Sequence, residues 1–164
     1  MNLKFRALFL PVLVLFLCAF SSVPSRKVGN RAPDFTLSVA GSSAKVTLSE
    51  INKESPVLLV FWATWCPSCR EEMPELNNWQ KTKTPKGLKI LAVNVEESKP
   101  DVEEFIKQNK LKYQVLMDEE GKVANSYGLV GIPVAIYLEK GGEVLYYGYQ
   151  LPQNIDTLLE PRRS

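Results

Sequence analysis

Histidine is absent from this sequence of 164 residues. Its absence excludes Ser-His-Asp and Cys-His catalysis, histidine metal sites and histidine pH switches. Cysteine is scarce as well, with only three residues, Cys18, Cys66 and Cys69. Because no histidine lies between Cys66 and Cys69, any control of their thiol pKa values must come from other groups.

A large excess of charge is also lacking, since 20 basic residues stand against 18 acidic ones. Lys4 and Arg6 belong to the first segment of the chain, so the remainder is nearly neutral. This balance gives no electrostatic basis for binding nucleic acid or an anionic membrane surface, and we expect no nucleic-acid partner. An apolar content of 45% suits one globular domain with a substantial core.

The N-terminal segment is typical of export. Lys4 and Arg6 precede an uncharged, almost wholly apolar run over residues 7–20. We expect residues 1–22 to be a signal peptide or membrane anchor and residues 25–164 to form one domain. Cys18 is interpreted as a small apolar residue rather than a lipid-attachment site, because bulky Leu17 precedes it.

Either form of this segment predicts a periplasmic or otherwise extracytoplasmic domain, soluble or anchored, where disulfides persist.

The apolar run 57–62 has no polar alternation and predicts a central parallel strand covered on both faces. Ser98 and Asp101 form a capping-box pattern, and Ser49 is a candidate cap for a short helical turn. The patterns predict further strands over 34–39, 45–48, 88–95, 113–117, 134–138 and 143–149. They also predict a helix that follows Cys66, a helix that begins at Ser98 and ends at about 109, and two more over 122–127 and 154–160.

These elements predict an α/β architecture. An N-terminal β-hairpin is followed by a βαβ unit, an inserted αβα segment and a closing ββα unit. Parallel strands joined by crossovers, with an antiparallel hairpin at the end, make a mixed central sheet flanked by helices.

The central motif is Trp65-Cys66-Pro67-Ser68-Cys69, between the buried strand and a helix. Two cysteines three residues apart at a helix start can form a disulfide. We expect Cys66 to face solvent at the helix N-terminus, which favours its thiolate, and Cys69 to be shielded. This asymmetry suits dithiol exchange, in which Cys66 attacks a substrate disulfide and Cys69 resolves the mixed disulfide.

Other roles for the two cysteines fit less well. A structural disulfide closing so short a loop adds little stability. A zinc site needs four ligands, and the domain offers two thiols and no histidine. Binding of copper(I) by two thiolates remains chemically open.

A second motif lies before the strand at 134–138. Gly131, Ile132 and Pro133 stand at its start, and proline is disfavoured inside a central strand. Pro133 should therefore be the residue that opens the strand. The sequence leaves the isomer of the Ile132–Pro133 bond open.

The Cys66–Cys69 motif, followed by Gly131-Ile132-Pro133, resembles the thioredoxin superfamily. More narrowly it resembles the secreted TlpA/ResA-type thiol-disulfide oxidoreductases. The resemblance covers nearly all of residues 28–160. It is also carried by residues 29–35, 61–66 and 93–95, and by Glu72 and Pro74.

The resemblance implies a thioredoxin fold with Cys66 as nucleophile and Cys69 as resolving cysteine. It also implies a cis Pro133 beside the sulfurs. Glu72 matches an acidic residue that assists proton transfer in this family, although an exposed acid serving the helix dipole fits the sequence equally well. The expected substrate contacts are Trp65, Pro67, Ile132 and Pro133, with no metal and no cofactor besides the redox-active disulfide.

The implied function is reduction of protein disulfides by a monomer, with cytochrome c maturation as a common task and a membrane protein relaying electrons. The missing histidine and Val60, at the place of the buried aspartate of cytoplasmic thioredoxins, depart from familiar patterns. Val134 stands where many relatives have threonine, which leaves substrate preference open. The alternatives are a disulfide oxidase or isomerase, a thiol peroxidase and a copper metallochaperone. The peroxidase is disfavoured because peroxiredoxins have threonine three residues before the reactive cysteine, where this sequence has Ala63.

Overall fold

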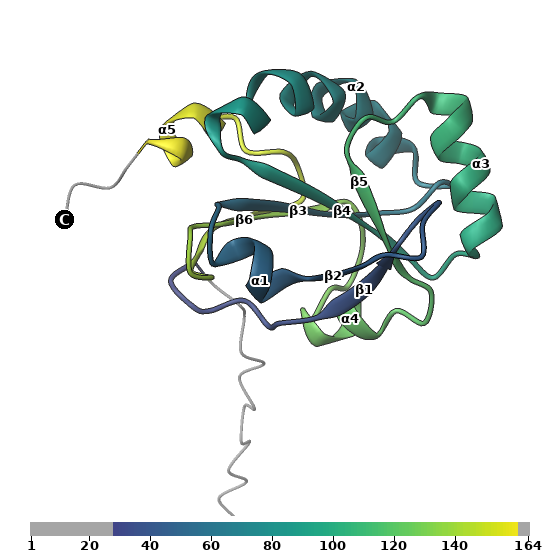
Figure 1. Cartoon of the computed structure of the whole chain (residues 1–164), viewed down its shortest axis with the longest axis horizontal. Coiled ribbons are helices and arrows are strands. Elements are labelled where there is room, and N and C mark those ends of the chain that lie inside the picture. The colour runs from purple at the N-terminus through teal and green to yellow at the C-terminus, as the bar shows by residue number, and fades with distance from the viewer. Residues whose placement is uncertain (1–27, 161–164) are drawn as a thin grey trace, which may run out of the picture.

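The computed structural model describes residues 28–160 (Figure 1). The expected signal or anchor segment, with Cys18, lies outside the described residues. Among the described residues no helix is both long and apolar enough to cross a membrane.

One mixed seven-stranded sheet runs through the described part of the chain, in the order β2-β1-β5-β4-β3-β6-β7. β3 is parallel to β4 and antiparallel to β6, so it lies between the crossover unit and the closing hairpin. The strands are β1 Thr36–Val39, β2 Lys45–Thr47, β3 Val57–Trp62, β4 Lys89–Val95, β5 Gln114–Asp118, β6 Val134–Leu138 and β7 Val144–Gly148.

Helices cover both faces of the sheet, as the sequence predicts (Figure 1). Helices α2, α3 and α5 pack on one face, and α1 and α4 pack on the other. The helices are α1 Leu48–Asn52, α2 Pro67–Thr82, α3 Lys99–Asn109, α4 Lys122–Ser126 and α5 Ile155–Leu159, with a 3-10 turn η1 at Thr84–Lys86.

β3 is buried along its whole length, which confirms the interpretation of its unbroken apolar run. Leu58, Val60 and Trp62 face the core under α2 and α3. The alternate residues of β3 face the core under α1 and α4. Pairing with β4 and with β6 sets the register of β3, and with it the point at which the cysteine motif leaves the strand.

α2 begins directly after Cys66, with Pro67 at a position where its missing N–H costs nothing. The helix continues through Pro74 to Thr82. Its buried residues, spaced three or four apart so that they form one apolar stripe against the sheet, are Cys69, Met73, Leu76 and Trp79.

Two of the expected caps have different outcomes. Ser98 is the N-cap of α3, where its Oγ accepts from the Asp101 N–H and donates to Asp101 Oδ2 at 2.6 Å. The expected cap at Ser49 is wrong, because β2 ends at Thr47 and Ser49 already lies inside α1. Its N–H and hydroxyl instead donate to the Asp34 carboxylate at 2.8 and 2.6 Å, a contact across the hairpin that local sequence does not reveal.

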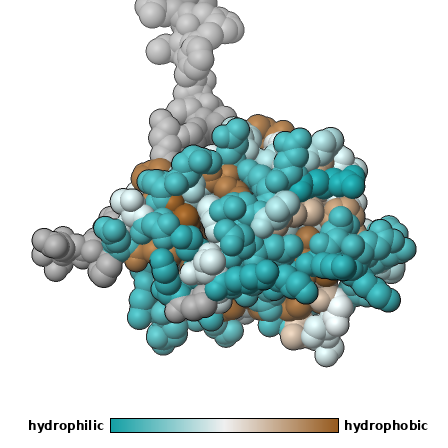
Figure 2. Space-filling view, turned by 90° about the horizontal axis from the view of Figure 1, so that it is seen from above, coloured by the Kyte–Doolittle hydropathy of each residue, from teal (hydrophilic) through white to brown (hydrophobic). Residues whose placement is uncertain are grey.

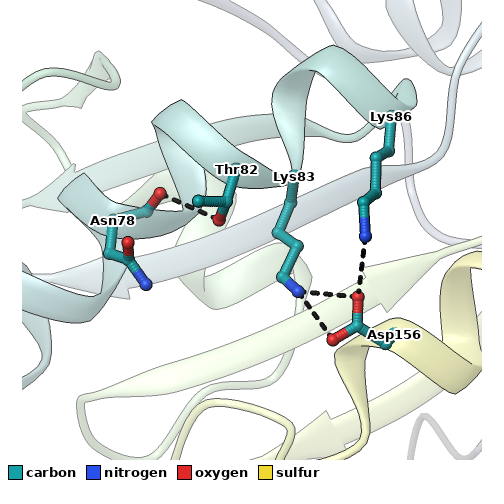
Figure 3. Close-up of polar contacts among 5 residues, drawn as sticks. All are labelled: Asn78, Thr82, Lys83, Lys86 and Asp156. Carbon is teal, nitrogen blue, oxygen red and sulfur yellow. Dashed lines mark hydrogen bonds and ion pairs between the residues drawn. The ribbon is translucent and has the colours of Figure 1, made fainter.

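The closing helix α5 is tied to the end of α2 and to the sheet. Figure 3 shows Lys83 Nζ donating to both carboxylate oxygens of Asp156, each at 2.6 Å, with Lys86 at 3.5 Å. The Tyr137 hydroxyl of β6 donates to the Leu158 carbonyl at 2.8 Å. These contacts place the loop before α5 against α2, where it forms one wall of the groove described below.

Replacing Ser98 by alanine removes the cap of α3, and we expect it to lower the free energy of unfolding by about 1 kcal/mol. Ser98→Asp keeps a capping oxygen and is the matched control. Urea unfolding of the two variants and the parent protein measures the difference. An equal loss in both variants would show that the cap is not the cause.

Candidate active site

The two cysteines lie where β3 meets α2. A turn from Ala63 to Cys66, closed by the Cys66 N–H and the Ala63 carbonyl at 3.3 Å, joins the strand to the helix. Cys66 is the N-cap residue of α2, and its Sγ accepts from the Cys69 N–H at 3.2 Å. Cys66 and Cys69 form a disulfide with their Cα atoms 5.3 Å apart.

The expectation that Cys66 faces solvent is wrong for the disulfide form. Cys66 and Cys69 are each only 3% exposed, so Cys69 is shielded as expected but Cys66 is shielded equally. The cause is the bond itself, because Cys69 belongs to the buried stripe of α2 and holds the Cys66 sulfur toward the core. The side chain that faces solvent at this turn is Trp65, which is 68% exposed.

The surroundings of Cys66 favour a negative sulfur after reduction. The Cys69 N–H already points at its Sγ, and the Ser68 hydroxyl lies 3.6 Å from it. Free N–H groups at a helix N-terminus carry partial positive charge and lower the pKa of a thiol placed there. The helix end therefore supplies part of the thiolate stabilisation that a histidine provides in other sites.

Glu72 is half-buried, unlike its exposed neighbour Glu71. Its Oε1 accepts from the Leu151 N–H at 2.9 Å, while its Oε2 is buried and has no partner among the described residues. Burial raises the pKa of Glu72, and the hydrogen bond from Leu151 opposes part of that rise. Burial and, secondarily, the Glu72 charge also raise the pKa values of Tyr113 and Tyr146.

Pro133 lies beside the cysteine motif. The peptide bond between Ile132 and Pro133 is cis, and Val134, the first residue of β6, pairs with Phe61 of β3. The loop before β6 therefore meets the end of β3 at the turn that carries Cys66.

Two hollows flank the motif. A groove of about 700 Å³ between α2 and the loop before α5 is lined by Ser68, Glu72, Pro133 and Leu151, among others. A smaller hollow of about 220 Å³ is lined by Trp65, Val130, Ile132 and other residues. The face that carries α2 is largely hydrophilic, with small hydrophobic patches (Figure 2).

The structure thus brings together Trp65, Cys66 and Cys69 where β3 meets α2, with Ile132 and Pro133 on the loop before β6. Pro67 is exposed at the start of α2 and lines neither hollow.

Sequence reasoning missed several residues that shape the site. Leu151 holds Glu72 through its backbone N–H, a contact that no side-chain pattern reveals. Tyr146 belongs to an aromatic edge of the strand that we interpreted as ordinary strand residues or a contact surface, and its hydroxyl donates to the Gln150 carbonyl at 2.7 Å and so steadies the same loop. Its phenol lies across Gly148, where an added Cβ would come within 2.3 Å of its oxygen.

The described residues contain no cluster of three or more cysteine, aspartate or glutamate side chains suited to a metal ion. The chemistry that the arrangement supports is exchange at the disulfide. A thiolate that attacks one sulfur of Cys66–Cys69 forms a mixed disulfide and releases the other sulfur, three residues away.

Known proteins resemble this chain in sequence and in fold. Residues 28–147 match the AhpC/TSA family. Thiol-disulfide oxidoreductase ResA of Bacillus thuringiensis subsp. konkukian is 31% identical over 169 residues, covering 96% of each chain. The crystal structure of a thiol:disulfide interchange protein DsbE from Chlorobium tepidum matches with a TM-score of 0.70 and 32% identity, covering 81% of this chain and 92% of that one.

StoA of Bacillus subtilis matches with a TM-score of 0.65 and 25% identity, covering 77% of this chain and 94% of that one. The expected thioredoxin fold and the resemblance to ResA-type proteins are confirmed. With its Cys66–Cys69 disulfide at the start of α2, the chain belongs to the AhpC/TSA family of thioredoxin-fold proteins and is a thiol-disulfide oxidoreductase of the ResA type.

Proposed function

We propose that the protein reduces disulfides of other proteins outside the cytoplasm. The observation that carries this proposal is the Cys66–Cys69 disulfide at the N-terminus of α2, beside Pro133 and an open groove. The reduced Cys66 thiolate attacks a substrate disulfide, and one substrate sulfur leaves as a thiolate. Cys69 then attacks Cys66, which releases the second substrate sulfur and leaves Cys66–Cys69 oxidised, so two electrons pass to the substrate.

The reductive direction is supported by what surrounds Cys66. A strongly oxidising dithiol needs a very stable thiolate. Here no histidine is available in the sequence, and the contacts at Cys66 Sγ are the Cys69 N–H and the Ser68 hydroxyl. These neutral groups stabilise the thiolate less than a cation does, so the dithiol gives up its electrons more readily.

Glu72 is proposed to move the proton of Cys69. It lies one turn after Cys69 on α2, and residues three apart on a helix are neighbours. Its buried Oε2 is free of partners among the described residues, and its pKa is raised by burial. A carboxyl group with these properties accepts the thiol proton as Cys69 attacks and returns it when the disulfide is reduced.

Substrate polypeptide is proposed to lie between Trp65 and the loop before β6. The exposed indole and Ile132 line one hollow, and Pro133 lines the other, so a chain crossing between them passes the disulfide. Pro67, which is exposed between Cys66 and Ser68 at the start of α2, is proposed to contact it as well.

The location and partners are proposed from the sequence. Lys4, Arg6 and the apolar run after them support export of the domain, soluble or anchored by residues 1–22. A reductase in an oxidising compartment needs a source of electrons, and we propose a membrane relay protein for that role. Cytochrome c maturation is the proposed pathway, and the working unit is proposed to be a monomer.

The equilibrium potential of Cys66–Cys69, measured in glutathione or dithiothreitol buffers, tests the direction. We expect a reduction potential of about −270 mV, as in thioredoxin. A value close to about −120 mV, as in strong disulfide oxidants, would contradict reduction as the physiological direction.

Cys66→Ala should abolish reduction of insulin disulfides, because it removes the attacking sulfur. Cys69→Ala keeps the attack but not the resolution, so we expect it to accumulate a mixed disulfide with substrate. Non-reducing electrophoresis followed by mass spectrometry detects that adduct. Full activity in Cys66→Ala would overturn the assigned roles. A mixed disulfide between substrate and Cys69 in that variant would overturn them as well.

Glu72→Gln should change how stability depends on pH. A carboxyl group whose pKa is raised by folding stabilises the folded state below its unfolded pKa of 4.5, and this contribution is lost as pH rises through the folded pKa. We therefore expect the stability of Glu72→Gln relative to the parent protein to increase between about pH 4 and about pH 7.

Urea unfolding of the disulfide form at both pH values measures this difference. Glu71→Gln, on the same helix but exposed, is the matched control for the loss of a carboxylate from α2. A Glu72→Gln difference that is the same at both pH values would mean that this carboxyl group titrates normally.

A further inference from the structure

Thr64 occupies the turn that presents the active-site residues. This turn runs from Ala63 to Cys66, between the buried end of β3 and the N-cap of α2. Within the turn Ala63 is fully buried and Trp65 is 68% exposed. A rotation at Thr64 would therefore move both the exposed indole and the sulfur of Cys66.

The Glu97 carboxylate holds this turn from a different part of the chain. Its Oε2 accepts from the Thr64 N–H at 2.7 Å, and its Oε1 accepts from the Thr64 hydroxyl. Its Oε2 also accepts from the Asn94 side-chain amide at 2.7 Å. Two of the three donors thus belong to one residue of the active-site turn, and they fix both its backbone and its side chain.

The anchor beneath Glu97 is rigid. Asn94 is completely buried on β4, where it pairs in register with Trp62, the last residue of β3. Glu97 follows β4 in the loop before α3, and the parallel arrangement brings the carboxyl ends of β3 and β4 together. Asn94 therefore ties the Glu97 carboxylate to the sheet, and Glu97 ties the turn to the same point.

Glu97 is not needed to begin the helix that follows it. Ser98 is the N-cap of α3 and serves the Asp101 N–H. Glu97 is half-buried, and its carboxylate accepts two hydrogen bonds from Thr64, which lies 33 residues earlier in the chain. Its role is therefore long-range. Hydrogen bonds to an ionised carboxylate are shorter and about twice as strong as neutral ones, which suits it to fix a turn.

We propose that Glu97 is a positioning residue for the thiol-disulfide reaction, acting through Thr64 to hold the Ala63–Cys66 turn in the geometry that places the Cys66 sulfur at the start of α2. The proposal rests on the dithiol chemistry of this site and not on its reductive direction. Misplacing a reacting group by about 1 Å can cost up to about a hundredfold in rate. Loss of the Glu97–Thr64 contact should therefore slow reactions of the Cys66 thiolate while leaving the fold intact.

The decisive comparison is between Thr64→Val and Thr64→Ser. Valine has nearly the shape of threonine but no hydroxyl, whereas serine keeps the donor to Glu97. The probe is oxidised glutathione, which the reduced protein converts to two glutathione molecules as Cys66 and Cys69 become a disulfide. We expect Thr64→Val and Glu97→Gln to react about tenfold more slowly than the parent protein, and Thr64→Ser to react at nearly the parental rate.

Trp65 supplies a second readout. Trp62 and Trp79 are 2% and 5% exposed, so fluorescence quenched by iodide comes from Trp65. We expect the anisotropy decay of this emission to gain a fast component in Thr64→Val and Glu97→Gln but not in Thr64→Ser. A double variant should lose no more rate than the more impaired single variant, because both changes remove the same contact.

Glu119→Gln makes the same change of charge on an exposed turn and is the control for charge alone. Parental rates in Thr64→Val, or an equal loss in Glu119→Gln, would overturn the proposal. Should Glu97→Gln fail to fold, the Thr64→Val and Thr64→Ser pair still decides. Failure to reduce insulin in the parent protein would count against the proposed function alone, since the glutathione reaction does not depend on it.

Discussion

The burial of β3 on both faces is the constraint on which the site depends. Residues Val57–Trp62 are buried along the whole strand and are paired in register with β4 on one side and with β6 on the other. The strand therefore ends at one fixed place, and Ala63 and Cys66 follow it there. α2 is anchored in turn by Cys69 and by the apolar stripe that continues it against the sheet.

The catalytic sulfurs thus share their packing with the core. Cys66 and Cys69 belong to the same buried cluster as Met73 and Trp62, and the disulfide pulls both sulfurs inward. Exchange requires an incoming sulfur to approach in line with the bond being broken, so substrate must reach a sulfur that the protein largely covers. The groove lined by Ser68 and Pro133 is the hollow through which we propose that a polypeptide approaches.

Local patterns were sufficient for much of the fold. The unbroken apolar run of β3 and the cap at Ser98 each depend on neighbours in sequence, and each was predicted, whereas Pro133 lies one residue before β6 and is not its first residue. The burial of Cys66 could not be predicted, because it results from the bond that draws its sulfur toward the core. The partners of Ser49, Glu72 and Glu97 lie 15, 79 and 33 residues away, so only the folded chain brings them together.

The two carboxylates near the disulfide have different environments, and these suggest different work. Glu97 accepts three hydrogen bonds that all lead to the sheet or to the active-site turn, so it links the two. Glu72 accepts one hydrogen bond, keeps a buried oxygen without a partner among the described residues, and has a pKa raised by burial. A fully engaged carboxylate is suited to fix geometry, and a partly desolvated one to exchange a proton. In a sequence without histidine, we propose that these two glutamates supply position and proton transfer.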